Sequence, residues 1–178
     1  SRGARSKFFF KWLTDPVENG GGALIDFGCY NALWSLWFKG RPQSVFAQVN
    51  HLQRERFPKG EDNSVMLLSY PDGVAVLEGS WDLPHGFQDL EIFGRDGSLS
   101  MTRQKVELRK GRRGERLEIE APPLSRERGD PIVYMIGRVE NDKPVDNIMA
   151  LDINVGVVEI LDAAKESVSI GKPVALSP

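Results

Sequence analysis

The spacing of apolar residues along the chain changes twice, and each change marks a different kind of element. Residues 23–39 carry apolar side chains on nearly every side of a helix, and such a helix is expected to be buried. Gly40 follows, and glycine commonly ends a helix with a positive φ. From residue 44 the apolar positions recur every second residue, which is typical of strands. Helical spacing returns after Pro131 and again over residues 147–169.

The strands expected in the middle of the chain are short and joined by tight turns. Pro71-Asp72-Gly73 and Asp96-Gly97 combine residues that favour turns, so the strands on either side of each should form antiparallel hairpins. A last short strand is expected at residues 174–176. The other predicted strands cover residues 45–49, 63–70, 74–82, 88–93, 98–102, 105–109 and 116–120.

This order of elements predicts an α+β fold. We expect one open-faced, mainly antiparallel sheet of about six or more strands, with helices packed on one face. Residues 65–68 and 74–77 are apolar at every position, so both faces of the sheet should be covered. A second copy of the chain is the simplest cover for the other face. We therefore expect a homodimer through that sheet face.

Composition and charge describe a globular chain. We take residues 1–178 as a single domain, because this length suits one well-packed domain and is short for two. The formal charge of −2, the pI near 5.8 and the mean hydropathy of −0.32 give no reason to bind nucleic acid or a membrane. The basic run at residues 109–114 is followed by three glutamates and is expected to be a solvated hairpin tip. No nucleic acid and no membrane partner are therefore expected.

The cysteine and histidine content argues against a disulfide and against a metal site in this chain. Cys29 is the single cysteine, which excludes an internal disulfide and favours a reducing, cytoplasmic setting. Its apolar neighbours indicate a buried, inert thiol. The two histidines, His51 and His85, stand far apart without other ligand residues nearby, so no metal site is expected. The chain begins in an arginine-rich segment without an initiator methionine, and we expect it to be a fragment.

The glycine-rich start of the first helix holds the candidate chemistry. Asp26 is the only carboxylate in this apolar segment, and burying a carboxylate without a partner is costly. Tyr30 follows four residues later, so the two side chains share one helix face. This pair has two interpretations. It forms a site, or Asp26 only complements the charge of the helix N-terminus and Tyr30 is a core aromatic residue.

The segment Gly20-Gly21-Gly22-Ala23-Leu24-Ile25-Asp26-Phe27-Gly28-Cys29-Tyr30 closely resembles the C-terminal domain of the glucose-fructose oxidoreductase/inositol dehydrogenase/rhizopine catabolism (Gfo/Idh/MocA) family. Known members have an N-terminal Rossmann domain that binds NAD or NADP, followed by an α/β domain whose open sheet often forms the subunit interface. The resemblance implies that our chain is a substrate-binding and oligomerisation domain. It extends over nearly the whole chain, with support from residues 10–12, 39–42, 79–84, 93–99 and 158–167.

The resemblance also implies roles for the two candidate residues. In this family an Asp and a His or Tyr four residues later line the substrate pocket, together with a lysine from the dinucleotide domain. Asp26 and Tyr30 match these positions, and tyrosine is similar to the glucose-fructose oxidoreductase and dimeric dihydrodiol dehydrogenase subgroup. The implied reaction is hydride transfer between nicotinamide and a sugar, polyol or related carbinol. Asp26 would orient the substrate or the lysine, and Tyr30 or the lysine would move the hydroxyl proton.

Three further residues are candidates for contact with a carbohydrate-like substrate. Trp12 and Trp81 could stack on a sugar ring, although a tryptophan is more often a core or interface residue. His85 follows a predicted strand in a loop, where binding groups often lie.

The chain departs from the family pattern in two respects. It contains no Gly-x-Gly-x-x-Gly segment after a strand, so its cofactor-binding residues are unknown and no cofactor should bind to the fragment alone. The family's lysine is also absent, because Lys143-Pro144 lies far downstream of Asp26. We therefore expect NAD or NADP to bind only in the complete protein. The competing interpretation is a stand-alone, non-catalytic module that dimerises or binds a ligand.

Overall fold

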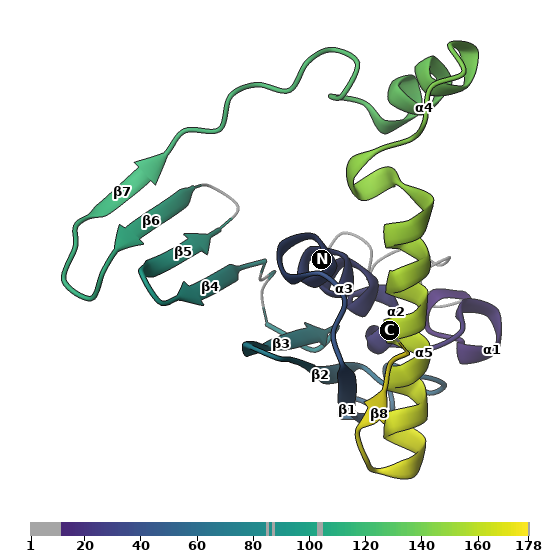
Figure 1. Ribbon diagram of the computed structural model, residues 1–178. Coiled ribbons are helices and arrows are strands. Elements are labelled where there is room, and N and C mark those ends of the chain that lie inside the picture. The colour runs from purple at the N-terminus through teal and green to yellow at the C-terminus, as the bar shows by residue number, and fades with distance from the viewer. Residues whose placement is uncertain (1–11, 85, 87, 103–104, 178) are drawn as a thin grey trace. The chain divides into compact units, whose positions relative to one another are not determined.

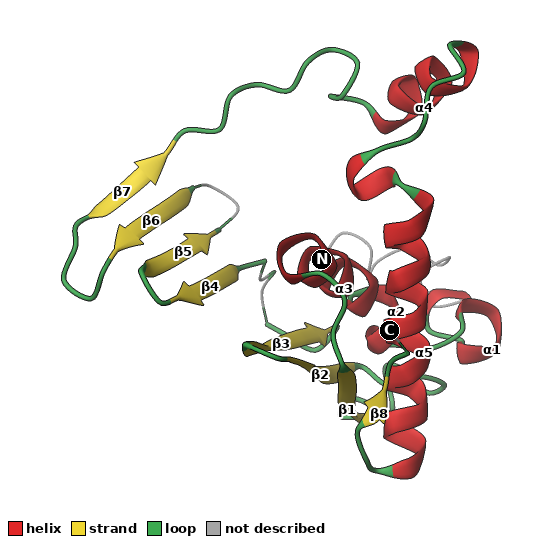
Figure 2. Ribbon diagram, viewed as in Figure 1, coloured by secondary structure: helices red, strands yellow, loops and turns green. Residues whose placement is uncertain are grey.

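The computed structural model describes residues 12–84, 86, 88–102 and 105–177. These residues belong to two compact units, one containing residues 1–84 and 145–178 and the other residues 85–144. Among the described residues, the first unit combines several helices with antiparallel strands and the second combines one helix with antiparallel strands, so the predicted α+β class is confirmed (Figure 2).

Most predicted helices are present within a few residues of their expected bounds. No helix in the described part of the chain is long and apolar enough to cross a membrane. The last predicted helix starts later than expected, because a 3₁₀ turn at Asn147–Met149 precedes it. The helices are α1 (Pro16–Asn19), α2 (Ala23–Asp26), α3 (Gly28–Lys39), α4 (Pro131–Glu140) and α5 (Leu151–Ile170).

The predicted helix over residues 23–39 is divided at Phe27 into α2 and α3. The Phe27 N–H donates to the Ala23 carbonyl at 3.1 Å, and the Phe27 carbonyl accepts from the Asn31 N–H at 3.2 Å. These bonds carry the helical course across the break. Gly40 ends α3 with a φ of 76°, as the sequence predicts.

The expectation that this helix is buried on nearly every side is wrong. Its inner side packs on α5 and on the sheet, but the opposite side is open among the described residues. Trp34 and Phe38 stack on this open side with ring centroids 5.8 Å apart, and Tyr30 is 61% exposed. A helix that is apolar on every side is buried only on the sides against which another element packs.

The first unit contains a four-stranded antiparallel sheet in the order β3-β2-β1-β8. The Pro71-Asp72 turn joins β2 to β3 as predicted. Helix α5 runs along β1 and β8, while α3 contacts β3 (Figure 1). The strands are β1 (Ser44–Asn50), β2 (Asn63–Tyr70), β3 (Gly73–Ser80) and β8 (Val174–Ala175).

Both faces of this sheet carry apolar side chains. Met66 and Leu68 are fully buried against the helices. Val74 and Val76 lie on the opposite face and are each 65% exposed. The two-sided apolar pattern is therefore present. The core is made by Leu24, Ala32, Val45, Ala47, Met66, Leu68, Tyr70, Val157, Ile160, Leu161, Ala163 and Ala164.

The second unit contains another four-stranded antiparallel sheet, in the order β4-β5-β6-β7. The predicted single sheet of six or more strands is thus divided into two, and no described strand pairs with both β3 and β4. The connection between these strands contains Pro84, which lacks the N–H that a strand ladder needs. The strands are β4 (Leu90–Gly94), β5 (Gly97–Met101), β6 (Val106–Lys110) and β7 (Arg116–Ile119).

The second unit contains the turns and the helix start that the sequence predicts. The hairpin predicted at Asp96-Gly97 is present, with Arg95 and Asp96 as its turn residues and Gly97 as the first residue of β5. The basic run at residues 109–114 spans the turn between β6 and β7. Asp130 caps α4 by accepting hydrogen bonds from the N–H groups of Ile132 and Val133. Pro131 occupies the first turn of the helix, where its missing N–H costs nothing.

Candidate functional site

The N-terminus of α2 is closed by Glu61, which lies just before β2. Its Oε1 accepts hydrogen bonds from the Gly22 N–H at 2.7 Å and from the Leu24 N–H at 3.2 Å. Its backbone carbonyl accepts from the Ala23 N–H at 2.9 Å. These N–H groups are the donors that a helix start leaves without partners and that phosphates often use. Here the protein itself fills that position.

The glycines around this helix allow the backbone to come close. A Cβ on Gly22 would lie 2.1 Å from the Glu61 carbonyl oxygen and 2.7 Å from its Cδ. A Cβ on Gly79 in β3 would lie 2.8 Å from the Cβ of Phe27. Distances under 3 Å require neighbouring atoms to move. The glycine-rich start therefore serves close packing of helix, loop and strand.

The carboxylate of Asp26 has a specific partner. The indole Nε1–H of Trp81 donates to Asp26 Oδ2 at 2.8 Å. Asp26 is the last residue of α2, and Trp81 directly follows β3, so two elements distant in sequence meet here. Both side chains are half-buried. The partner expected for this carboxylate is thus one of the tryptophans singled out from the sequence.

Trp81 is held from two further directions. Its ring lies against the fully buried Phe57, with centroids 5.3 Å apart and planes tilted by 44°. Its backbone N–H donates to the Asp62 carbonyl at 2.8 Å. The carboxylate of Asp62 is itself buried and accepts hydrogen bonds from the N–H groups of Leu52 at 2.9 Å and Gln53 at 2.6 Å. Sequence patterns did not reveal Phe57, Glu61 or Asp62, because their contacts span many residues.

Tyr30 stands one helical turn after Asp26, near the start of α3, with its side chain 61% exposed. Between them, the Cys29 thiol donates to the Asp26 backbone carbonyl at 3.4 Å. Burial raises the pKa of the Cys29 thiol, and the nearby Asp26 charge acts in the same direction. This agrees with the inert thiol expected from the sequence, although Cys29 is only half-buried.

The other substrate-contact candidates from the sequence, Trp12 and His85, are not shown in contact with Asp26 or Trp81. Trp12 lies before α1 and is 47% exposed, with its carbonyl accepting from the Asp15 N–H at 3.0 Å. It takes no part in the Asp26–Trp81 hydrogen bond. His85 lies outside the described residues. Within the described part of the chain, no three His, Cys, Asp or Glu side chains gather in a way that could hold a metal ion.

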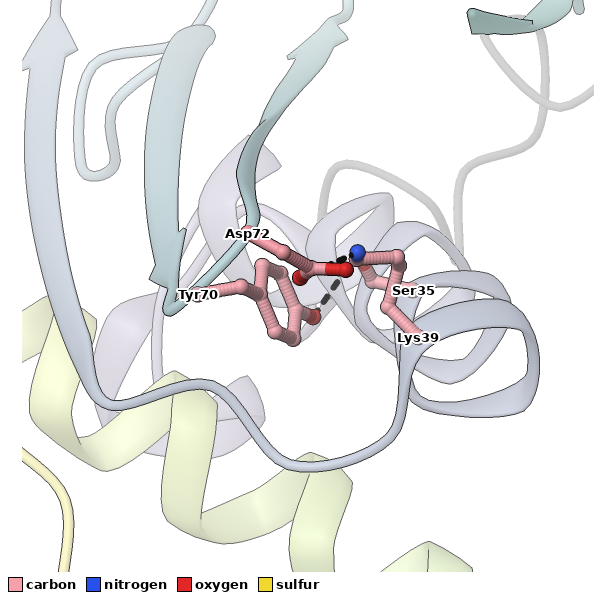
Figure 3. A network of polar contacts seen from close by, with 4 residues as sticks. All are labelled: Ser35, Lys39, Tyr70 and Asp72. Atoms are coloured by element: carbon pink, nitrogen blue, oxygen red, sulfur yellow. Dashed lines mark hydrogen bonds and ion pairs between the residues drawn. The ribbon is translucent and has the colours of Figure 1, made fainter. Parts of the chain in front are cut away.

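The far end of α3 is fixed by a separate polar network (Figure 3). The Lys39 ammonium donates to Asp72 Oδ1 at 2.6 Å and lies 5.4 Å from the centroid of the Tyr70 ring. Tyr70 Oη donates to Ser35 Oγ at 3.4 Å. Lys39 lowers the pKa of Asp72, whereas burial raises the pKa of Tyr70. These contacts join α3 to the β2–β3 turn and so hold the helix that carries Tyr30.

The geometry therefore combines a held carboxylate at the end of α2 with an exposed phenol near the start of α3. A carboxylate oxygen accepts hydrogen bonds, and a phenol both donates and accepts them. Such a pair suits a ligand that carries hydroxyl groups.

Solved structures with the same fold include several oxidoreductases, each under 25% identical to this chain. An aldose-aldose oxidoreductase from Caulobacter crescentus, solved with glycerol, has a TM-score of 0.78 and 18% identity over 93% of this chain and 51% of its own. A levoglucosan dehydrogenase, solved with NADH and levoglucosan, has a TM-score of 0.75 and 15% identity over 95% and 54% of the two chains. GenD2 of gentamicin A biosynthesis, solved with NAD, has a TM-score of 0.72 and 24% identity over 94% and 52%. Our chain thus spans about half the length of each.

Sequence comparison identifies the family. No curated protein is a significant match to the chain. The family model described as the GFO/IDH/MocA C-terminal domain matches residues 2–100, a stretch that contains Asp26, Tyr30 and Trp81. Because this match spans more than half of the chain and the fold agrees with it, the protein belongs to the GFO/IDH/MocA family, whose C-terminal domain this chain represents.

Proposed function

We propose that this chain is the substrate-binding and dimerisation domain of an NAD(P)-dependent oxidoreductase that acts on a sugar, polyol or related carbinol. The observation that carries the proposal is the family match across the segment that contains Tyr30 and the Asp26 carboxylate held by Trp81. The relatives solved with glycerol or levoglucosan, and with NAD or NADH, support this class of substrate and cofactor.

Asp26 and Tyr30 form the proposed reactive pair. Asp26 accepts a hydrogen bond from a substrate hydroxyl and so orients the carbon that carries it. Tyr30 takes the position that some family members fill with histidine, and this supports assigning the protein to the tyrosine subgroup. Its exposed phenol exchanges the hydroxyl proton, alone or together with a lysine of the dinucleotide domain. Trp12 and His85 are further proposed substrate contacts.

The nicotinamide cofactor, when bound, supplies or accepts the hydride. The described residues of this chain do not offer it a phosphate-binding helix start at the glycine run, because Glu61 already occupies the N–H groups of Gly22 and Leu24. The chain therefore contributes the substrate side of the site, and another domain of the complete protein holds the dinucleotide.

The exposed side of the first sheet is the proposed dimer face. Val74 and Val76 are each 65% exposed there, and Leu67 is 36% exposed beside them. An apolar surface of this kind is covered most simply by its own copy in a two-fold arrangement.

The experiment pairs the complete protein with the present chain. The complete protein is assayed with NAD and with NADP against a panel of aldoses, polyols and anhydro sugars, by the absorbance of the reduced nicotinamide. We expect turnover with at least one member of the panel. The chain of residues 1–178 is titrated with NADPH by fluorescence, and we expect no measurable binding. Inactivity over the whole panel, or micromolar binding by the chain alone, would contradict the proposal.

A further inference from the structure

We infer that Trp81 is a positioning residue for Asp26: the indole N–H of Trp81 sets the orientation of the Asp26 carboxylate. The hydrogen bond itself is a feature of the fold. Its consequence for catalysis rests on the function proposed above. The hydrogen bond and its effect on catalysis are therefore tested separately.

The hydrogen bond between Trp81 and Asp26 has a fixed direction. An indole N–H donates but cannot accept, and its distance of 2.8 Å from Asp26 Oδ2 is that of a good hydrogen bond to a carboxylate. A hydrogen bond to an ionised acceptor is stronger than the same bond to a neutral one. The Trp81 indole therefore holds Oδ2 of the Asp26 carboxylate against its N–H.

The indole is the fixed member of the pair. Its ring contacts the buried Phe57, and its backbone N–H is bonded to the Asp62 carbonyl. Asp62 in turn is tied to the loop that follows β1 by two hydrogen bonds from backbone N–H groups. Since the ring is held by these contacts, the carboxylate takes its orientation from the ring. This is the support that a preorganised functional group requires.

The second oxygen of Asp26 is left for another partner. Among the described residues, Oδ1 accepts no hydrogen bond, whereas Oδ2 is engaged by Trp81. One carboxylate oxygen is thus used to orient the group and the other is available to a substrate hydroxyl. Trp81 therefore acts through Asp26, a role different from the ring stacking considered from the sequence.

The first test needs no substrate. The complete protein is labelled with ¹⁵N at its tryptophan indoles, and the Trp81 resonance is assigned by its loss in Trp81→Phe. We expect Asp26→Asn to move this resonance, because the variant replaces the carboxylate that accepts the hydrogen bond of the indole. A Trp81 resonance that does not respond to Asp26→Asn would overturn the inference.

The second test measures kcat and KM separately with the best substrate of the panel. Trp81→Phe keeps a ring against Phe57 but removes the N–H that orients Asp26, so kcat should fall about tenfold or more. Trp37→Phe, at an exposed position of α3, serves as the matched control and should leave both unchanged.

The outcomes separate the two proposals. If Trp81→Phe leaves kcat unchanged while Asp26→Asn lowers it, the positioning role is wrong and the proposed function stands. If Asp26→Asn also leaves the rate unchanged, the site assignment itself fails. Should Trp81→Phe not fold, benzothienylalanine at position 81 keeps the shape of the indole without the N–H, and the same criteria apply to it.

Discussion

Oε1 of Glu61 accepts a 2.7 Å hydrogen bond from the backbone N–H of Gly22, which lies 39 residues earlier in the chain. This contact joins the loop before β2 to the start of α2 and fills the helix N-terminus with a charge of the favourable sign. The glycine run is therefore part of the scaffold that positions Asp26 at the other end of α2.

Gly22→Ala should destabilise the protein by about 2 kcal/mol or more, because the added Cβ would lie 2.1 Å from a backbone oxygen of Glu61. The free energy of unfolding in urea measures this change. Gly137→Ala in α4 is the matched control, since no atom lies within 4 Å of that Cβ. The control should be neutral or stabilise by up to about 1 kcal/mol. Equal stability of Gly22→Ala and the native protein would show that the close approach is not required.

Tyr70→Phe should change the response of stability to alkaline pH. Burial raises the pKa of Tyr70 above its ordinary value of 10.0, so the neutral phenol stabilises the folded state below that pH. This contribution is lost as the pH rises from 10.0 through the higher folded-state pKa. The variant should therefore lose less stability than the native protein above pH 10.0, as measured by urea unfolding across this range.

At neutral pH the free energy of unfolding of Tyr70→Phe should be lower than that of the native protein by less than about 1 kcal/mol. The reason is that the hydrogen bond from Tyr70 to Ser35 is long, at 3.4 Å. Parallel alkaline profiles for Tyr70→Phe and the native protein would mean that Tyr70 does not titrate differently in the two states.

Asp26→Asn and Tyr30→Phe should each lower kcat of the complete enzyme by about a hundredfold, since each removes one charge or one hydroxyl with little change of shape. Tyr30→Phe should leave stability unchanged, because the side chain is 61% exposed. Steady-state kinetics and thermal unfolding of the same samples provide the two measurements. A loss of folding with activity retained per folded molecule would favour the interpretation of Asp26 and Tyr30 as structural residues.

Val76→Glu should dissociate the expected homodimer, because it places a charge on the exposed apolar face of the first sheet. Sedimentation equilibrium at micromolar concentration should give twice the chain mass of 19.9 kDa for the native chain and the single mass for the variant. Val17→Glu in α1, which is 90% exposed, introduces the same charge elsewhere and should not dissociate it. A native chain that remains monomeric would refute the proposed dimer face.

Local sequence signals were sufficient for most of the secondary structure. The preferences of a few adjacent residues decide the turns at Pro71-Asp72 and Arg95-Asp96, the cap at Asp130 and the end of α3 at Gly40. The spacing of Asp26 and Tyr30 is equally local, so helical periodicity alone is enough to identify this candidate pair.

Long-range contacts could not be found in this way. The partner of Asp26 is Trp81, 55 residues away, and the helix start is closed by Glu61. The sequence contains the acid, the indole and the glycines, but no periodicity states which of them meet. The tertiary structure decided these pairings, because they depend on how α2 packs between β3 and the loop before β2. It also decided that α3 has an exposed side, since burial depends on the neighbours of a helix as well as on its own residues.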